Sequence, residues 1–446
     1  MEKSMSLEQE IKDFVNGMGI DVVGVAGPGR FDGPPSLDLN YILKGGKSVI
    51  PFAIPFDVEA LYSYLSRKSA IPHNIDQYRV HQRVIHAAEK LKKFLEAKGH
   101  RAAHIAPNAG YRKDPKSTFA LMPQFSHRYA AYVTGIAAPG ISGSAVTEKY
   151  GGSVCLNSVI TDAVLEGDPM LPPRHIFDGL CQECMACTES CPPKMFMKTT
   201  EEYSLINGQF YPRGKKRDTN LCAVSCGGLH AISADKTWSN WGKGWIDSWT
   251  GVEPDPEKQN IGADMRRVFG FNQDLPARIS PIAVVVQDAI EEGFFEEGGP
   301  FPSYEELEGE TEGQKLRSFA DAIEKHVTDN AIADPLALTC NQCNVVCGPT
   351  AEESNKRWQM IKKGGILTYK ENNEPCWVHD FPEAEQMRKD YQYKVKKQVV
   401  KEVNGRRFKI LTKHLGIDFH TIFKGRSYKK KLNKALNAAG LPPQDF

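Results

Sequence analysis

The sequence lacks any apolar run of the roughly 18 residues that a helix needs to cross a bilayer. Residues 1–19 contain neither an apolar signal core nor a twin-arginine pair. A surplus of charge is lacking too, since 56 Lys and Arg residues stand against 55 Asp and Glu residues. We therefore expect a cytoplasmic protein with no transmembrane segment, and its net charge selects no class of partner.

The common phosphate-binding loops are also missing. Residues 45–48 end like a P-loop, but Tyr41 stands where the first glycine of that motif belongs. Residues 27–29 begin like a dinucleotide-binding fingerprint, but Asp32 replaces its third glycine. We therefore do not expect a nicotinamide cofactor.

What the sequence does contain is a set of eleven cysteines, most of them in tight clusters. Extracellular disulfide frameworks scatter their cysteines, so this grouping favours a reducing compartment. The first run has the spacing C-x2-C-x2-C-x3-C-P and consists of Cys181, Cys184, Cys187, Cys191 and Pro192. This spacing is typical of ferredoxins with two [4Fe–4S] clusters, in which the fourth cysteine serves the other cluster. Structural zinc prefers two separated C-x2-C pairs.

A second run, Cys340, Cys343 and Cys347, supplies two ligands for its own cluster and one for the first. One thiolate is missing, and Cys222 and Cys226 are the candidates. We assign Cys181, Cys184, Cys187 and Cys347 to cluster one. Cluster two receives Cys191, Cys340, Cys343 and Cys222. The leftover Cys155 and Cys376 are expected to be structural.

The first hundred residues alternate helix and strand patterns. Apolar residues recur at helical spacing in some segments, and short continuous apolar runs in others suit buried strands. This alternation indicates an α/β sheet domain. The predicted elements are a helix over 7–18 ending at Gly19, strands over 20–26 and 48–55, a helix with an apolar face over 80–95 ending at Gly99, and a strand over 101–106.

Three further segments are unusual in composition. Residues 131–168 are rich in Gly, Ser, Thr and Ala, which suits either close ligand contact or a loop. Residues 291–312 carry nine glutamates and are expected to form an exposed loop. Residues 388–446 contain sixteen Lys or Arg and four Asp or Glu, a net charge of +12. This tail is either a solvated extension or a contact for an acidic protein, a membrane surface or nucleic acid.

The order of these segments resembles the superfamily of cobalamin-dependent reductive dehalogenases and epoxyqueuosine reductase. The similar features are residues 19–26 (GIDVVGVA), 47–50 (KSVI), 134–136 (TGI), 150–152 (YGG), 159–162 (VITD) and the two cysteine runs. The resemblance covers residues 7–349. It implies an α+β/α/β fold in which a nitroreductase-like cobalamin-binding core carries a ferredoxin-like domain with two [4Fe–4S] clusters.

On this resemblance the chain divides into five segments. They are 1–175 (core, first part), 176–230 (cluster domain, first part), 231–335 (core, second part, with the acidic loop), 336–376 (second cysteine run) and 377–446 (basic extension). The resemblance implies a base-off cobalamin with no protein histidine below the cobalt. The sequence agrees, since the Asp-x-His-x-x-Gly ligand motif is absent and its nearest match, at Asp418 and His420, ends in Phe423. The expected cobalamin contacts are Thr134, Gly135, Gly140, Ser142, Gly143, Ser144, Tyr150 and Gly151.

Either family reaction needs a proton donor. Dehalogenases of this superfamily use a Tyr supported by a basic residue, because an adjacent cation lowers the cost of ionising the phenol. Tyr111 with Arg112 fits that chemistry, and His127 with Arg128 is the alternative. Residues 120–128, where epoxyqueuosine reductases carry an acidic residue, contain no carboxylate.

The leading hypothesis is a corrinoid iron–sulfur reductase resembling the reductive dehalogenases, which takes electrons from a low-potential ferredoxin or flavodoxin and acts on a small molecule. A second hypothesis is epoxyqueuosine reduction on tRNA, favoured by the basic tail and disfavoured by the missing acid. A third is a non-enzymatic electron-transfer protein that serves another corrinoid protein.

Overall fold

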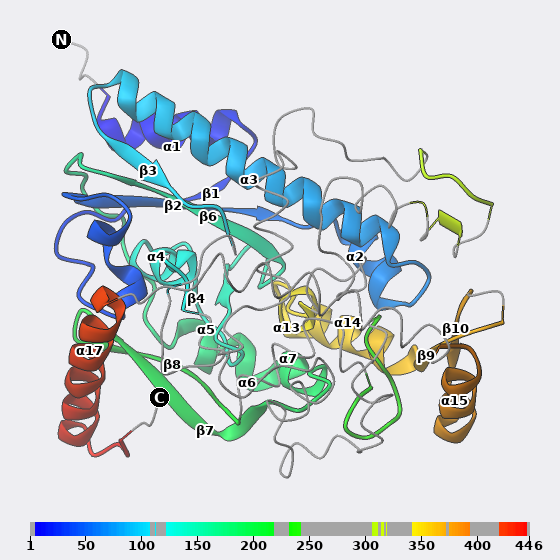
Figure 1. Ribbon diagram of the computed structural model, residues 1–446. Coiled ribbons are helices and arrows are strands. Elements are labelled where there is room, and N and C mark those ends of the chain that lie inside the picture. Colours follow the sequence, from blue (N-terminus) through cyan, green and yellow to red (C-terminus); the bar gives the residue numbers. More distant parts are fainter. Residues whose placement is uncertain are drawn as a thin grey trace.

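The computed structural model describes residues 5–107, 112, 122–217, 232–241, 306–310, 314–315, 318, 341–371, 374–392 and 419–443. Its central feature is a four-stranded sheet in the order β1-β2-β6-β3 (Figure 1). Every neighbouring pair in this sheet is antiparallel. The strands are β1 (Val22–Val23), β2 (Ser48–Pro55), β3 (Ala102–His104) and β6 (Val154–Thr161).

The two long strands lie at the centre and are buried on both faces. Side chains alternate along a strand, so Ile50, Phe52 and Ile54 of β2 enter one hydrophobic cluster. Val49, which precedes Ile50, enters a second cluster on the opposite face. This two-sided burial explains why the sequence of β2 is a continuous apolar run instead of an alternating one.

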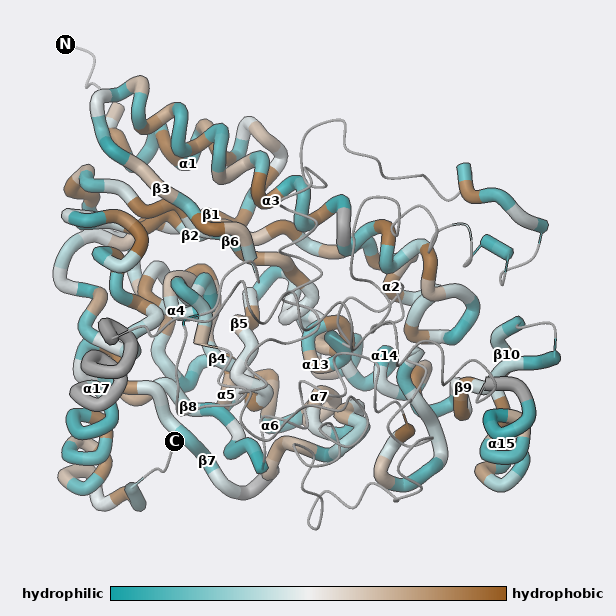
Figure 2. The backbone as a smooth tube through the Cα atoms, viewed as in Figure 1, coloured by the Kyte–Doolittle hydropathy of each residue, from teal (hydrophilic) through white to brown (hydrophobic). Residues whose placement is uncertain are grey.

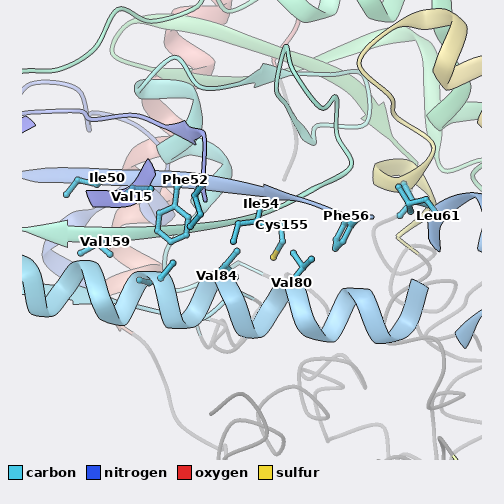
Figure 3. Packing of buried hydrophobic residues seen from close by; sticks show 14 of the residues in the cluster. Val15, Ile50, Phe52, Ile54, Phe56, Leu61, Val80, Val84, Cys155 and Val159 are labelled. Atoms are coloured by element: carbon cyan, nitrogen blue, oxygen red, sulfur yellow. The ribbon is translucent and has the colours of Figure 1, made fainter. Parts of the chain in front are cut away.

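One face of the sheet is covered by α1 (Leu7–Gly17) and the 27-residue α3 (Ile71–Ala97). Figure 3 shows Val80 and Val84 of α3 directed at the sheet, beside Ile54 and Cys155. Ser6 caps α1 by accepting a hydrogen bond from the backbone N–H of Gln9. The other face is covered by α4 (His127–Val133), whose Ala130, Ala131 and Val133 are fully buried.

The sequence predictions for this region differ from the structure in the extent of three elements, one of which is β3, whose three residues lie within the strand predicted over 101–106. The strand expected over 20–26 is reduced to β1 and a bridge between Ala26 and Val49. The helix whose apolar face was predicted over 80–95 begins at Ile71. Its first turns carry the buried polar residues His73, Asn74 and Gln77, which interrupt the apolar pattern. Strand β2 has the predicted bounds.

The remaining elements include those that carry the two cysteine runs (Figure 1). Along the chain, the segments that connect the sheet strands contain η1 (Pro35–Leu37), η2 (Leu39–Tyr41), α2 (Val58–Leu65), β4 (Ala138–Pro139) and β5 (Ala145–Val146). After the sheet come α5 (His175–Asp178), α6 (Leu180–Cys184), α7 (Ala186–Glu189), β7 (Phe196–Ile206), β8 (Gln209–Lys216), α13 (Gln342–Val345), α14 (Ala351–Lys363), β9 (Ile366–Tyr369), β10 (Pro375–Val378), α15 (Phe381–Met387), η3 (Arg388–Gln392) and α17 (Phe419–Ala438).

Part of the basic tail is anchored to the rest of the molecule. Leu432 and Leu436 of α17 are fully buried and pack with Leu205 of the β7–β8 hairpin. The Tyr428 hydroxyl accepts a hydrogen bond of 2.9 Å from the Leu205 backbone N–H, and Lys431 pairs with Asp32. The described end of the tail is therefore a docked helix, and residues 393–418 lie outside the described ranges.

The elements also differ in hydropathy. Figure 2 shows hydrophobic residues gathered along β1 and β2, whereas α15 is mostly hydrophilic. Among the helices that the structure describes, none combines the length and apolarity that a bilayer crossing requires. Of the acidic segment 291–312, residues 306–310 alone are described.

Candidate functional site

The first cysteine run is wound into two short helices. Cys181 and Cys184 lie on α6 and Cys187 on α7, with Met185 between them in the left-handed conformation (φ 52°). This reversal folds the three thiols around one short loop. A wrapped loop of this kind is what the C-x2-C-x2-C spacing provides for a cubic cluster.

Cys347 of the second run returns to this loop. The Cys187 thiol has its pKa raised well above the ordinary value, first by burial and then by the neighbouring Cys347, Cys181, Cys343 and Cys184 sulfurs. Burial and the adjacent Cys181 raise the pKa of Cys347 to about 12. Cys181, Cys187 and Cys347 also share one hydrophobic cluster. The structure thus brings together the four residues assigned to cluster one.

Cys191 lies in a different place, with Met195, Phe196 and Cys343. The Met195 backbone N–H donates to Cys191 Sγ at 3.4 Å. Cys343 therefore packs with Cys191, although it also contributes to the raised pKa of Cys187. The other cysteines named for cluster two, Cys222 and Cys340, and the alternative Cys226, lie outside the described residues.

Glycines let the preceding segment approach the thiols closely. A Cβ at Gly152 would lie 3.2 Å from Cys347 Sγ, and one at Gly140 would lie 3.4 Å from Cys181 Sγ. Gly151 (φ 66°) is tighter still, since its Cβ would lie 2.3 Å from the Gly348 carbonyl carbon. The glycine-rich stretch of the sequence therefore packs against both cysteine loops.

A buried arginine fastens the second cysteine loop to this segment. The Arg357 guanidinium donates to Ser153 Oγ at 2.6 Å and to the Val345 carbonyl at 3.0 Å, and pairs with Glu353 at 2.7 Å. Ser153 Oγ lies 3.0 Å from the Cys347 carbonyl oxygen. The sequence analysis did not predict these contacts of Arg357. The one signal available for them is the i,i+4 spacing of Glu353 and Arg357 on α14.

The two leftover cysteines lie apart from these groups. Cys155 is buried on β6 within the core, and burial raises the pKa of its thiol to about 12. Cys376 Sγ on β10 lies 2.8 Å from Thr368 Oγ1 on β9. Among the described residues, no three His, Cys, Asp or Glu side chains are grouped so as to hold a single metal ion. In a cubic cluster each iron takes one protein thiolate, so its ligands surround the cluster instead of converging on a point.

The expected proton-donor residues are used mainly in internal contacts. Arg112 is buried, donates to the carbonyl oxygens of Pro35 (2.7 Å) and Gln124 (2.8 Å), and stacks on Tyr41. His127 Nδ1 lies 3.0 Å from Ser158 Oγ, and burial lowers the pKa of this imidazole to about 3. Arg128 is exposed and donates to the Gly143 carbonyl at 3.3 Å. Tyr111 lies outside the described residues.

The side chains expected to contact cobalamin also have partners within the chain. Thr134 Oγ1 donates to the Ala130 carbonyl, Ser142 Oγ accepts from the Ser144 N–H, Ser144 Oγ bonds Asn344, and Tyr150 donates to Asp21. Gly135 (φ 73°) lies against the Pro169 carbonyl, and Gly143 (φ 74°) against Arg213. The hydroxyl groups of this stretch thus make hydrogen bonds within the chain.

A phenol and guanidinium group beside Gly143 was not anticipated from the sequence. Tyr132 donates to the Gly143 carbonyl at 3.3 Å and stacks on Tyr211, with ring centroids 5.5 Å apart. Burial raises the pKa of Tyr132, while the cations Arg128 and Arg213 oppose that rise. These residues come from α4, the β4–β5 turn and β8, so no local sequence motif announces them.

No protein-family model and no curated protein matches this chain. Solved structures similar to it include a catabolic reductive dehalogenase in complex with 3-bromo-4-hydroxybenzoic acid, with 16% identity and a TM-score of 0.37. That match covers 52% of this chain and 30% of the dehalogenase, so the chain spans less than a third of that protein's length.

The similar structures also include epoxyqueuosine reductases. The enzyme from Bacillus subtilis has 15% identity and a TM-score of 0.33, and the match covers 80% of this chain and 99% of that one. An epoxyqueuosine reductase bound to a modified tRNA stem loop gives the same identity, TM-score and coverage. Both enzyme groups of the sequence resemblance thus recur among the similar structures.

Proposed function

We propose that this chain is an iron–sulfur redox protein that holds two [4Fe–4S] clusters and serves a corrinoid-dependent reduction. The observation that carries the proposal is the sorting of the thiols. Cys347, distant in sequence, lies with Cys181, Cys184 and Cys187, whereas Cys191 of the first run lies with Cys343 of the second. This exchange of one cysteine between runs is the ligation pattern of two-cluster ferredoxins.

The surroundings of the thiols fit iron–sulfur clusters. The Ala186 backbone N–H lies 3.4 Å from Cys184 Sγ, the Met195 N–H lies at the same distance from Cys191 Sγ, and the Ile141 N–H donates to Cys181. Such donors stabilise the negative charge that sulfur carries in a cluster. The apolar neighbours Ile141, Val146 and Phe177 exclude water from the first site.

Two clusters ligated entirely by thiolates relay electrons and leave the reduction of a substrate to another group. On the sequence resemblance we propose that this group is a base-off cobalamin, which supplies low-potential reducing chemistry when bound. The described residues expected to contact it have their side-chain bonds within the chain, so any corrinoid contact from residues 134–151 involves backbone.

We also propose a substrate class and an electron donor. A small organic substrate and a low-potential ferredoxin or flavodoxin are the leading partners, and tRNA is the second. Lys430, Lys431 and Lys434 of α17 are exposed and offer a positive surface to either an acidic donor or a phosphate backbone. A purely electron-transferring protein is the third reading, and it agrees with the internally bonded side chains of residues 134–151.

Anaerobic reconstitution followed by metal analysis tests the proposal. We expect about eight irons per chain and one bound cobalamin, whose Co(II) spectrum by electron paramagnetic resonance lacks superhyperfine splitting from an axial nitrogen. Replacement of Cys222 by Ser should remove one cluster, whereas Cys226→Ser should leave both. About four irons per chain would overturn the two-cluster assignment, and eight irons without cobalamin binding would favour the electron-transfer reading.

A further inference from the structure

Between two ligands assigned to cluster two lies a glutamine with an unusual environment. Gln342 stands in the sequence Cys340-Asn341-Gln342-Cys343 and is the first residue of α13. Its side chain is 0% exposed. Neither the Nε2 nor the Oε1 atom has a hydrogen-bond partner in the part of the chain that the structure describes.

An unpaired amide in the interior is costly, because it gives up its hydrogen bonds to water and gains none in return. The Gln342 backbone does not share this problem, since its carbonyl accepts from the Val346 N–H at 3.0 Å. The cost thus falls on the carboxamide alone. A buried glutamine that has no side-chain partner among the described residues, and that lies between two cysteines assigned as cluster ligands, points to a partner outside the polypeptide.

The neighbourhood of Gln342 narrows the choice of partner. Cys343, the next residue, packs with Cys191, and α13 packs against α7, which carries Cys187. Val345 and Val346, on the same turn, are fully buried and apolar. In these dry surroundings the cluster sulfurs are the acceptors that a ligand loop brings close, and the carboxamide N–H is a donor suited to them.

We propose that the Gln342 carboxamide donates a hydrogen bond to a sulfur atom of cluster two and sets the reduction potential of that cluster. This inference rests on the two-cluster assignment proposed above. A hydrogen bond to sulfur is stronger when the cluster carries the additional electron, so it stabilises the reduced state and raises the potential. Gln342 is then a positioning residue that makes cluster two easier to reduce.

The test compares substitutions that change the donor but keep the size of the side chain. Gln342→Met removes the N–H and should shift the midpoint potential of one cluster to a more negative value. Gln342→Leu also removes the N–H and should shift the potential in the same direction. The potential of the other cluster should stay unchanged in both variants.

A matched control is available on α3. Gln77 is 3% exposed, and its Nε2 lies 2.8 Å from the His73 ring, within the helix-covered face of the sheet. Gln77→Met also removes a buried amide and should lower stability while both cluster potentials remain at the wild-type values.

The measurement is a redox titration of reconstituted protein, followed by electron paramagnetic resonance, with iron counted for each variant. Unchanged potentials in Gln342→Met with full iron content would overturn the inference while leaving the two clusters in place. Wild-type protein that fails to assemble two clusters would overturn the proposed function itself. If the Met variant loses iron, wild-type protein carrying ¹⁵N at the glutamine amide decides: a hyperfine coupling between the reduced cluster and that nitrogen supports the hydrogen bond, and its absence refutes it.

Discussion

The sheet core and the cysteine loops differ in the contacts that hold them together. In the core, Ile50, Phe52 and Val84 are fully buried apolar side chains whose contribution grows with the area that they remove from water. In the loops, polar contacts and close approaches are added to such burial: Arg357 bonds Ser153 and the Val345 carbonyl, and a Cβ at Gly152 would lie 3.2 Å from Cys347 Sγ. The core should therefore tolerate apolar exchange that conserves volume, whereas the loops should not tolerate the loss of one atom pair.

The largest expected effect comes from removing a thiol that joins the two runs. Cys347→Ser should lower the iron content from about eight to about four per chain, because cluster one loses the ligand that the second run supplies. Cys376→Ser is the control, since that thiol lies on β10 beside Thr368. Iron analysis of the two purified variants measures the difference. Equal iron in both would remove Cys347 from the ligand set.

The next effect concerns the close approach of backbone at Gly151. An alanine there must adopt a positive φ and would place its Cβ 2.3 Å from the Gly348 carbonyl carbon. We expect a loss of about 2–5 kcal/mol in the free energy of unfolding, from left-handed strain together with overpacking. Denaturant unfolding measures it, and iron content should fall as well.

Gly19 provides the control for that strain. It also has a positive φ (72°), but nothing lies within 4 Å of its Cβ position. Gly19→Ala should therefore cost only the left-handed strain of about 1–2 kcal/mol and leave the iron content unchanged. Equal losses at the two positions would show that the contact with the second cysteine loop contributes nothing.

A cavity in the core should lower stability without changing the clusters. Leu91 of α3 is fully buried against the sheet. Leu91→Ala should lower the free energy of unfolding by about 2–5 kcal/mol through lost burial and the cavity left behind. Clusters assembled in the folded variant should keep their iron and their potentials. A shift of either potential would show that core packing and cluster geometry are coupled.

The sequence predicted the part of the fold that depends on apolar pattern. Strand β2 was found with its bounds because all but its last residue are buried, which leaves a continuous apolar run. The start of α3 was missed because His73, Asn74 and Gln77 are polar yet buried, so the apolar period is lost there. Strand β6, which holds the centre of the sheet with β2, was not predicted, since the polar residues Asn157 and Ser158 lie within it.

For the candidate site, cysteine spacing is itself the signal, and the division of the thiols between two clusters stays a prediction from that spacing. The sequence could not predict the residues that fasten the loops. Arg357 recognises the Val345 carbonyl and Ser153, and any residue type offers such a carbonyl. The alternative ligands Cys222 and Cys226 and the donor Tyr111 stay as predictions, since they lie outside the described residues.

The smallest effect is a pH dependence of the core. Burial raises the pKa of Asp76 on α3 to about 6, above its ordinary value of 3.8, and the Asp57 carboxylate adds to the rise. The folded state therefore holds this proton more tightly than the unfolded state. Its contribution to stability is fully present below about pH 3.8 and is lost as pH rises through about 6.

Replacing Asp76 by Asn should remove this dependence while keeping an oxygen that accepts from the Asp57 backbone N–H, now at 2.8 Å. Partial exposure weakens the effect, so we expect the variant to gain about 1 kcal/mol relative to wild type between pH 5 and pH 8. Urea unfolding at the two pH values measures the gain. Asp76 bonds the Asp57 backbone before α2, so we expect the cluster potentials to stay unchanged. A change in them with this substitution would show that the core and the loops are coupled.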